Sequence, residues 1–450
     1  MNDSSRTVDV TEVIEKQRLR WFVVRLILVS WVVTFFDGYD LNVIAFAAPY
    51  MREAYALDAS MLRDVFSTGI AGTLFGGFLF GFLGDRWGRR PTIILSTTLF
   101  GLLTLLLAKA DTYWELVAIR FLNGLALGGV LPLIWALSVE YVATRYRATI
   151  VTLIMLGYGI GVSTAGPISV ILSPLFGWQS VFVFGGGASL VAALLLYYTL
   201  PESLRFLATR PHDNARMARI VKRLAPERTD LEGARFVMSG LVETARRPWW
   251  DVRSLFSGGL RNITPLLWIG YAASSMTSFF FTTWGPLVFE SLGFTRATAA
   301  YASSLNSLAG AFGAVCLMRF TDRIGAISVA VLPAIAVPLL LYIGFEPVSH
   351  ASFIAMMAVL MIFLGGSHYG IISISGTFYP TAHRALGTGW LSAMGKIGSV
   401  AAPWLGYYIQ DANIPVQRTF ALLAIPPAIF AAAIFVIGML ERRGRVRAAA

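Results

Sequence analysis

The sequence has little charge and almost no cysteine. Only 14% of its 450 residues are Asp, Glu, Lys or Arg, and 56% are hydrophobic, whereas a water-soluble domain has about 25% charged residues. The single cysteine, Cys316, excludes a disulfide framework and a cysteine-based metal site. The polar N-terminal segment lacks the features of a cleaved signal peptide. No phosphate-binding loop, metal-ligand cluster or catalytic triad is visible, so we expect neither an enzyme nor a cofactor.

Long apolar runs are present instead, each near the ~20 residues that a helix needs to cross a bilayer. We predict an all-α membrane protein with twelve transmembrane helices in two six-helix bundles, 22–200 and 262–440. A polar cytoplasmic linker, 201–261, joins the bundles, and tails at 1–21 and 441–450 flank them. The predicted helices are 22–47, 63–84, 92–110, 113–138, 148–172, 179–200, 263–288, 297–318, 327–344, 351–376, 386–409 and 417–440.

The net charge of +11 reflects membrane orientation and does not indicate nucleic-acid binding. Most of the 36 Lys and Arg residues fall in the tails, the linker and the even-to-odd loops, which the positive-inside rule assigns to the cytoplasm. We therefore expect a multi-pass protein of the plasma (bacterial inner) membrane with both termini cytoplasmic and basic residues near anionic lipids. Five basic residues are expected to face outward: Arg52, Arg63, Lys109, Arg296 and Arg418.

An internal repeat relates the two halves. Asp85 in the loop after the second helix corresponds to Asp322 after the eighth, and Arg147 corresponds to Arg384, with the same offset of 237 positions. Halves with a common register are typical of transporters built from repeats, which hold their substrate near the membrane midplane between the repeats.

The segment Gly81–Pro91, GFLGDRWGRRP, is expected to form a gate at the cytoplasmic face. Its glycines would let the second and third helices pack closely, and Asp85 with its neighbouring arginines would form an ion-pair network that holds one of two conformations. We expect a second network of Glu140 with Arg145 and Arg147. The predicted gating residues are Gly81, Asp85, Arg86, Gly88, Arg89, Arg90, Glu140, Arg147, Asp322, Arg323 and Arg384.

This segment resembles the signature loop of the major facilitator superfamily. The resemblance extends over the whole chain through the repeat at Asp322, Arg323 and Gly325, Pro201-Glu202-Ser203 and Tyr379-Pro380-Thr381 with Arg384. Within the superfamily the chain resembles the aromatic acid:proton symporter group at Asp37–Pro49, Arg120–Pro132 and Gly387–Gly398. That resemblance implies a role for the first-helix aspartates, Asp37 and Asp40, in proton-coupled transport.

Asp37 and Asp40 are unusual because a bare carboxylate in hydrocarbon costs roughly 2.5–3.5 kcal/mol on insertion scales. Their i, i+3 spacing places both on one side of the first helix. Asp40 and Arg120 lie at similar depth, roughly 10 Å from the outer ends of their helices at ~1.5 Å per residue. They could therefore pair, either as a switch or as a static link between the first and fourth helices. The link would leave Asp37 without a structural role.

Lys396 carries the other deep charge, in the eleventh helix. The resemblance leads us to expect arginine here, and lysine keeps the charge but loses the bidentate fork. The 237 offset pairs Lys396 with Gly159, so this charge belongs to one half only and function explains it better than fold. It would attract a substrate carboxylate, or else pair with Asp37.

An aromatic substrate also needs polar and aromatic neighbours. His368 is predicted as a proton relay or a pocket wall, with a non-titrating structural histidine as the alternative. Tyrosines are preferred because their hydroxyls need polar partners. The predicted substrate-binding residues are Arg120, Lys396, Tyr39, Tyr158, His368 and Tyr369.

The sequence thus predicts proton-coupled uptake of a small organic anion, best an aromatic carboxylate, by a protein that works as a monomer. A proton-linked sugar or polyol porter is an alternative, against which Arg120 and Lys396 speak because a neutral substrate needs no cation. A membrane sensor that binds aromatic acids without moving them is another, although the basic linker is too short to be an output domain.

Overall fold

The computed structural model describes residues 7–17, 20–210, 213–227, 234–238, 251–324 and 326–449. Asp322 and Arg323 lie in 317–328, whose side chains are outside the described residues. The twelve predicted apolar runs each fall on a helix, except that the last is divided between α15 and α16. The helices are α2 (Trp21–Ala54), α3 (Ala59–Trp87), α4 (Arg89–Leu107), α5 (Tyr113–Glu140), α6 (Arg147–Phe176), α7 (Gln179–Thr199), α10 (Leu260–Ser291), α11 (Arg296–Ile324), α12 (Ala326–Phe345), α13 (His350–Phe378), α14 (Thr381–Asp411), α15 (Val416–Leu422) and α16 (Ile425–Ala449).

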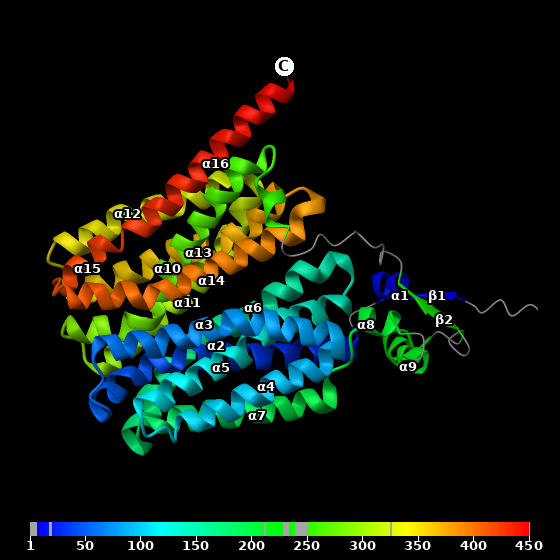
Figure 1. Cartoon of the computed structure of the whole chain (residues 1–450), viewed down its shortest axis with the longest axis horizontal. Helices are drawn as coiled ribbons and strands as arrows, with labels where there is room; N and C mark the ends of the chain where they lie inside the picture. Colours follow the sequence, from blue (N-terminus) through cyan, green and yellow to red (C-terminus); the bar gives the residue numbers. More distant parts are fainter. Residues whose placement is uncertain are drawn as a thin grey trace, which may run out of the picture.

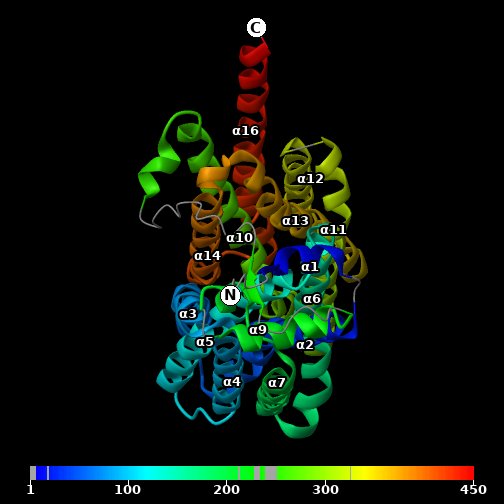
Figure 2. The ribbon, with the colours of Figure 1, turned by 90° about the vertical axis from the view of Figure 1, so that its right-hand side faces the viewer.

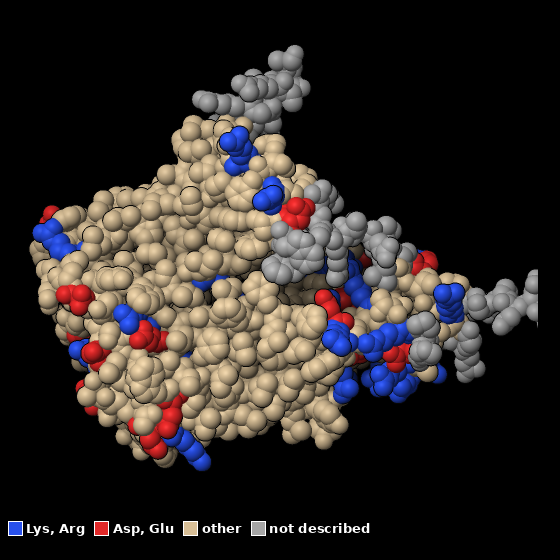
Figure 3. Space-filling model, viewed as in Figure 1, with Lys and Arg blue, Asp and Glu red and all other residues tan. Residues whose placement is uncertain are grey.

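Within the described residues, eight helical segments are long and apolar enough to cross a membrane. Helices α10 and α14 are not among them, because serines, threonines and glycines lower their hydropathy. In the view of Figure 3 charged side chains gather at two opposite ends, and the band between them is nearly free of charge. A surface of this kind suits a hydrocarbon environment.

Helix pairing repeats between the halves. In the N-terminal half α2 packs on α6 and α3 on α5; in the C-terminal half α10 packs on α14 and α11 on α13. The halves meet where α6 packs on α11 and α3 on α14. Figure 1 shows the C-terminal half above the N-terminal half, with the helices diverging toward the end that carries β1 and β2. The internal repeat of the sequence is therefore a repeat of the fold.

The tail and the linker form a small unit at that end, seen face-on in Figure 2. Strand β1 (Thr7–Asp9) pairs in parallel with β2 (Arg235–Val237), and α1 (Val10–Lys16) contacts α9 (Asn214–Leu224), which follows the short α8 (Leu204–Ala208). Buried apolar residues of α1 and α9 share one cluster with residues of α2 and α5. We call residues 7–17, 204–210, 213–227 and 234–237 the tail–linker unit. From the sequence we expected only polar connections here. The connection to α10 includes one more short helix, η3 (Val252–Phe256).

Glycines bring α3 and α5 together. A Cβ added to Gly76 would lie 1.9 Å from the carbonyl oxygen of Leu125, and one added to Gly124 would lie 2.0 Å from that of Gly69. Small residues allow such close backbone approach between membrane helices. Gly81, predicted to serve the same purpose, has nothing within 4 Å of an added Cβ. That part of the prediction is wrong for this structure.

Replacing a glycine by alanine should have opposite effects at Gly76, which lies in a helix contact, and at Gly81, which does not. Gly76→Ala should force α3 and α5 apart and destabilise the protein by more than about 1 kcal/mol, in the range of overpacked cores. Gly81→Ala should be neutral or stabilising, because alanine is favoured over glycine inside a helix by roughly 0.5–1 kcal/mol. Thermal unfolding in detergent measures both. Equal melting temperatures for the two variants would contradict the packing described here.

Glu15 of α1 fastens the tail to the loop after α5. The Thr144 hydroxyl and the Thr144 backbone N–H donate to its carboxylate, with N···O distances of 2.9 and 3.1 Å, and these bonds lower the pKa of Glu15. Because the folded-state pKa lies below the unfolded value of about 4.3, the stabilisation is complete above that value and is lost as the pH falls through the folded pKa.

Glu15→Gln should therefore lower stability at pH 7, by no more than about 1 kcal/mol for an exposed group. The difference from the wild type should close below about pH 4. Glu12→Gln is the matched control, since Glu12 lies on the same helix and its carboxylate pairs with Lys16 within that helix. Melting curves at both pH values measure the effect, and a Glu15→Gln deficit that persists unchanged at low pH would refute it.

Candidate functional site

A cavity of about 220 Å³ lies between the two halves and carries one acid and one base. Asp37 reaches it from α2 and Lys396 from α14, so each half supplies one charge. Asp37 is only 4% exposed, and the two charges attract each other. No other Asp, Glu, Lys or Arg lines this cavity among the described residues. We call it the charged cavity.

The ammonium group of Lys396 rests on the other half of the molecule. Its Nζ donates to the carbonyl oxygen of Thr73 on α3, at 2.7 Å, and a Cβ added to Gly77 would lie 3.3 Å from it. Among the described residues this nitrogen has no carboxylate within ion-pair distance, which leaves two of its three donors for another acceptor. Lys396 is therefore placed to receive an anion.

Asp40 and Arg120 lie together, away from the charged cavity. Both side chains are buried. Asp40 accepts a hydrogen bond from the hydroxyl of Thr104 on α4, and this hydroxyl accepts one from the Asn123 amide at 2.9 Å. Asp40 and Arg120 attract each other but form no direct hydrogen bond, and the Nε and Nη1 atoms of Arg120 have no partner among the described residues. Asp40 and Arg120, predicted to pair, thus attract each other without a direct bond, within a cluster that includes Thr104 and Asn123. Arg120 does not line the cavity, contrary to its predicted role at the substrate.

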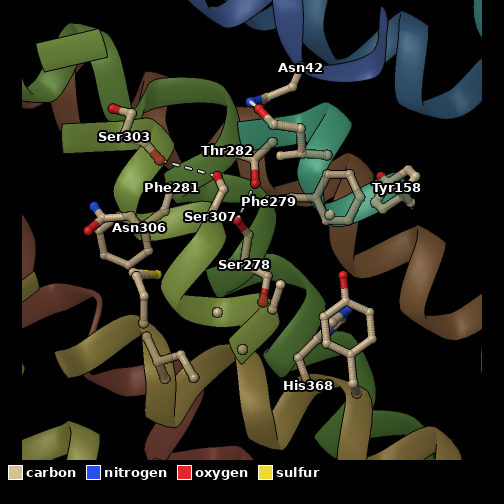
Figure 4. A pocket seen from close by; sticks show the side chains of 18 of the residues that line it. Asn42, Tyr158, Ser278, Phe279, Phe281, Thr282, Ser303, Asn306, Ser307 and His368 are labelled. Carbon is tan, nitrogen blue, oxygen red and sulfur yellow. Dashed lines mark hydrogen bonds between the residues drawn. The ribbon is translucent and has the colours of Figure 1, made fainter. Parts of the chain in front are cut away.

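Three of the predicted aromatic and histidine residues do come together. Tyr158 and His368 line the charged cavity and also a second one of about 120 Å³, which Tyr369 helps to line (Figure 4). His368 Nδ1 lies 3.1 Å from Ser274 Oγ, and its ring stacks on Tyr271 with centroids 5.3 Å apart. The second cavity has no charged residue among its described lining, and we call it the neutral cavity.

Tyr39 is a correction to the predicted substrate residues. Its side chain is fully buried between α2 and α7, where its hydroxyl donates to the Val181 carbonyl oxygen at 2.9 Å and its ring meets Phe184 edge-on. Successive helix residues are rotated by about 100°, so Tyr39 points away from the side that Asp37 occupies. It stabilises the packing of the N-terminal half.

At the tail–linker end the predicted ion-pair network has a different centre. Arg89 pairs with Glu140, which also accepts from the Ser203 hydroxyl at 2.7 Å. Glu202 accepts from the backbone N–H groups of Arg89 and Arg90, at 2.8 and 3.1 Å, at the start of α4. Gly88 permits this turn with a φ of +106°. The Pro201-Glu202-Ser203 motif thus anchors the ends of α3, α4 and α5.

The side chains of other predicted gating residues take no part in this network. Asp85, Arg86 and Arg384 are exposed, and no ion pair of Asp85 occurs among the described residues. Arg147 donates to the Val142 carbonyl oxygen at 3.3 Å and not to Glu140. Arg90 donates to the Tyr197 carbonyl oxygen at 2.7 Å. The expected Asp85-centred and Glu140–Arg147 networks are therefore not those of this conformation.

The opposite end is closed by contacts between the halves. The Arg63 guanidinium of α3 lies 4.2 Å from the ring centre of Trp404 and 4.6 Å from that of Tyr407, both on α14. Arg296 of α11 pairs with Glu53 of α2. From the sequence we expected these arginines only to face outward. The signal that could have revealed their role is that few other charged residues lie on that side.

The comparisons agree with this architecture. The sequence profile of the Major Facilitator Superfamily matches residues 30–260 and 267–449. The chain belongs to this superfamily, and it is therefore a multi-pass membrane transporter and not an enzyme. A bacterial homologue of the human lysosomal transporter Spinster, crystallised inward-facing and unoccupied, aligns with a TM-score of 0.70 at 15% identity, over 93% of this chain and 97% of that one.

Among curated proteins the chain is similar to transporters of aromatic acids. It is 29% identical to the 4-hydroxybenzoate transporter PcaK of Pseudomonas aeruginosa, over 96% of each chain. It is 30% identical to the PcaK of Acinetobacter baylyi, over 93% of this chain and 91% of that one. The gallate transporter of Pseudomonas putida is 28% identical over 96% of this chain and 94% of its own. The predicted resemblance is confirmed.

The network at the tail–linker end makes a stability prediction. Glu140→Gln should destabilise this conformation by roughly 1–3 kcal/mol, because it leaves the half-buried Arg89 guanidinium without its counter-charge. Asp85→Asn, an exposed carboxylate on the adjoining helix end, should stay within about 0.5 kcal/mol of wild type. Thermal unfolding in detergent distinguishes them. A larger loss for Asp85→Asn would restore the network that the sequence predicted.

Proposed function

We propose that the protein carries an aromatic carboxylate into the cell together with a proton, by alternating exposure of the charged cavity. The single observation that supports this best is Lys396, which faces Asp37 in a cavity that no other charged residue of the described chain lines. Lysine supplies a point charge for a carboxylate, and the adjoining Tyr158 and Phe279 offer flat apolar surface to a ring. The aromatic-acid transporters to which the chain is similar support the same substrate class.

Charge balance links the proton to the substrate. With Asp37 ionised and Lys396 protonated the charged cavity is neutral, and a bound carboxylate would make it negative. Closing a cavity around an uncompensated charge is costly. Uptake of one proton by Asp37 restores neutrality and releases Lys396 to bind the substrate. This scheme predicts one proton per carboxylate.

Asp37 carries the coupling proton in this proposal, and Asp40 has a supporting role. Asp40 lies behind the cavity and is held by Thr104 and by attraction to Arg120, so its charge is compensated within one half. Asp37 is compensated across the two halves. Only its partner moves away when the halves separate.

The orientation follows from the basic tail–linker unit. Helix α9 carries Arg216, Arg219, Lys222 and Arg223, and the positive-inside rule assigns such segments to the cytoplasm. The Arg63 and Arg296 contacts then close the outer end, and the structure is an inward-facing state with both termini cytoplasmic. We infer a plasma-membrane location and function as a monomer, since the two charges of the cavity, Asp37 and Lys396, both come from this chain.

Uptake into proteoliposomes with an imposed pH gradient tests the proposal. Asp37→Asn should abolish accumulation of benzoate-type acids against a gradient, while exchange of internal for external substrate continues, because exchange moves no net proton. Lys396→Ala should raise KM about 10–100-fold, corresponding to loss of one charged hydrogen bond.

Tyr39→Phe is the control, since Tyr39 lies away from the cavity and its loss should leave KM unchanged. Accumulation by Asp37→Asn equal to that of wild type would show that this aspartate does not carry the proton. An unchanged KM in Lys396→Ala would show that the lysine does not bind the carboxylate.

A further inference from the structure

The neutral cavity adjoins the charged cavity directly. Leu41, Tyr158, Phe279 and His368 line both, so the two spaces share one wall. In Figure 4, Tyr158 and His368 lie on one side of the neutral cavity and Ser303 and Asn306 on the other. A molecule that occupied both cavities, with its carboxylate near Lys396, would lie against these residues and reach toward α11.

The far side of the neutral cavity is polar. Ser278 and Thr282 of α10 and Ser303, Asn306 and Ser307 of α11 line it. Some of these groups are already bonded: the Thr282 hydroxyl donates to the Ser278 carbonyl oxygen at 2.9 Å, and that of Ser307 donates to the Ser303 carbonyl oxygen at 3.2 Å.

Two of the groups are buried and unsatisfied. Ser303 and Asn306 are 7% and 6% exposed, and within the described part of the chain neither Ser303 Oγ nor Asn306 Oδ1 has a hydrogen-bond partner. Buried polar atoms are nearly always bonded, and an exception calls for an explanation. A ligand group that supplies the missing bonds is such an explanation.

The charge of that group follows from the lining. No Asp, Glu, Lys or Arg lines the neutral cavity in the described part of the chain, so a second carboxylate or an ammonium would be desolvated there without a counter-charge. A phenolic hydroxyl is neutral at pH 7, because its pKa lies near 10. It can donate to the Asn306 amide oxygen and accept from a serine hydroxyl.

We propose that the neutral cavity is a specificity subsite for an uncharged hydroxyl group on the ring of the substrate, read by Ser303 and Asn306. The inference rests on the proposed function, because it takes the carboxylate to be held by Lys396. The ring then lies against the shared wall of Tyr158, Phe279 and His368. The preferred substrates are hydroxylated aromatic monocarboxylates.

Proteoliposome uptake of three matched acids tests the subsite: benzoate, 4-hydroxybenzoate and 4-carboxybenzoate. The wild type should show the lowest KM for 4-hydroxybenzoate and the highest for 4-carboxybenzoate. Asn306→Leu, close in size but without hydrogen bonds, should raise the KM for 4-hydroxybenzoate about tenfold and leave that for benzoate within about twofold, as expected for one hydrogen bond. Ser303→Ala should act in the same direction, about threefold.

Ser304→Ala is the matched control. Ser304 is the next residue of α11, is 5% exposed and also has an unpartnered hydroxyl, but it packs against Gly166 of α6 and does not line the neutral cavity. It should change neither KM. Benzoate uptake reports whether each variant is folded. If Asn306→Leu loses uptake of both acids, the KM values of Ser303→Ala for the two acids decide whether the subsite exists.

The outcomes separate the subsite from the proposed function. Equal KM values for benzoate and 4-hydroxybenzoate in the wild type, or equal shifts for both acids in the variants, would overturn the subsite while the carboxylate site stands. Preference for 4-carboxybenzoate would overturn the neutrality argument. A wild type that carries none of the acids would refute the proposed function, and the subsite with it.

Discussion

The attraction between Asp37 and Lys396 is the interaction on which the rest of the structure depends. It crosses the boundary between the halves inside a region of low polarity, where opposite charges interact strongly and unpaired charges are costly. Two other deep carboxylates of the described chain have their neighbours within one half or near one end: Asp40 lies by Thr104 and Arg120, and Glu140 by Arg89 and Ser203. In the proposed mechanism Asp37 and Lys396 lose their mutual attraction when the halves move, and the proton and the substrate compensate them.

Helix contacts within a half and the lining of the cavities use different kinds of residue. Glycines along α3 and α5 bring two backbones of the N-terminal half into close contact. The faces of α10 and α11 that meet the cavities carry serine, threonine and asparagine. Rigid halves with a polar space between them are what a rocking mechanism requires. The low hydropathy of α10 and α14 is therefore a consequence of their position.

The fold and the two charges of the cavity could be predicted from the sequence, because the twelve apolar runs, the repeat offset and the deep charges Asp37 and Lys396 are all visible in it. The neighbours of a side chain could not. Tyr39 lies between Asp37 and Asp40 in the sequence, but its side chain points to α7. Glu140 accepts a hydrogen bond from Ser203, although Arg147 is nearer in the sequence. Ser303 and Asn306 form part of a polar run in α11 that carries no charge. We chose candidate site residues mainly by their charge or aromatic ring, and therefore did not select these two.

The contacts that close the end opposite the tail–linker unit differ chemically from those of the cavity. An arginine stacked on Trp404 and Tyr407 keeps its charge at every physiological pH, and the rings stay neutral over the same range. The Arg63 contact is therefore insensitive to pH over that range, whereas in the proposed mechanism the cavity responds to a single proton. In the proposed mechanism, acidification therefore acts on the charged cavity and leaves the stacked Arg63 contact in place.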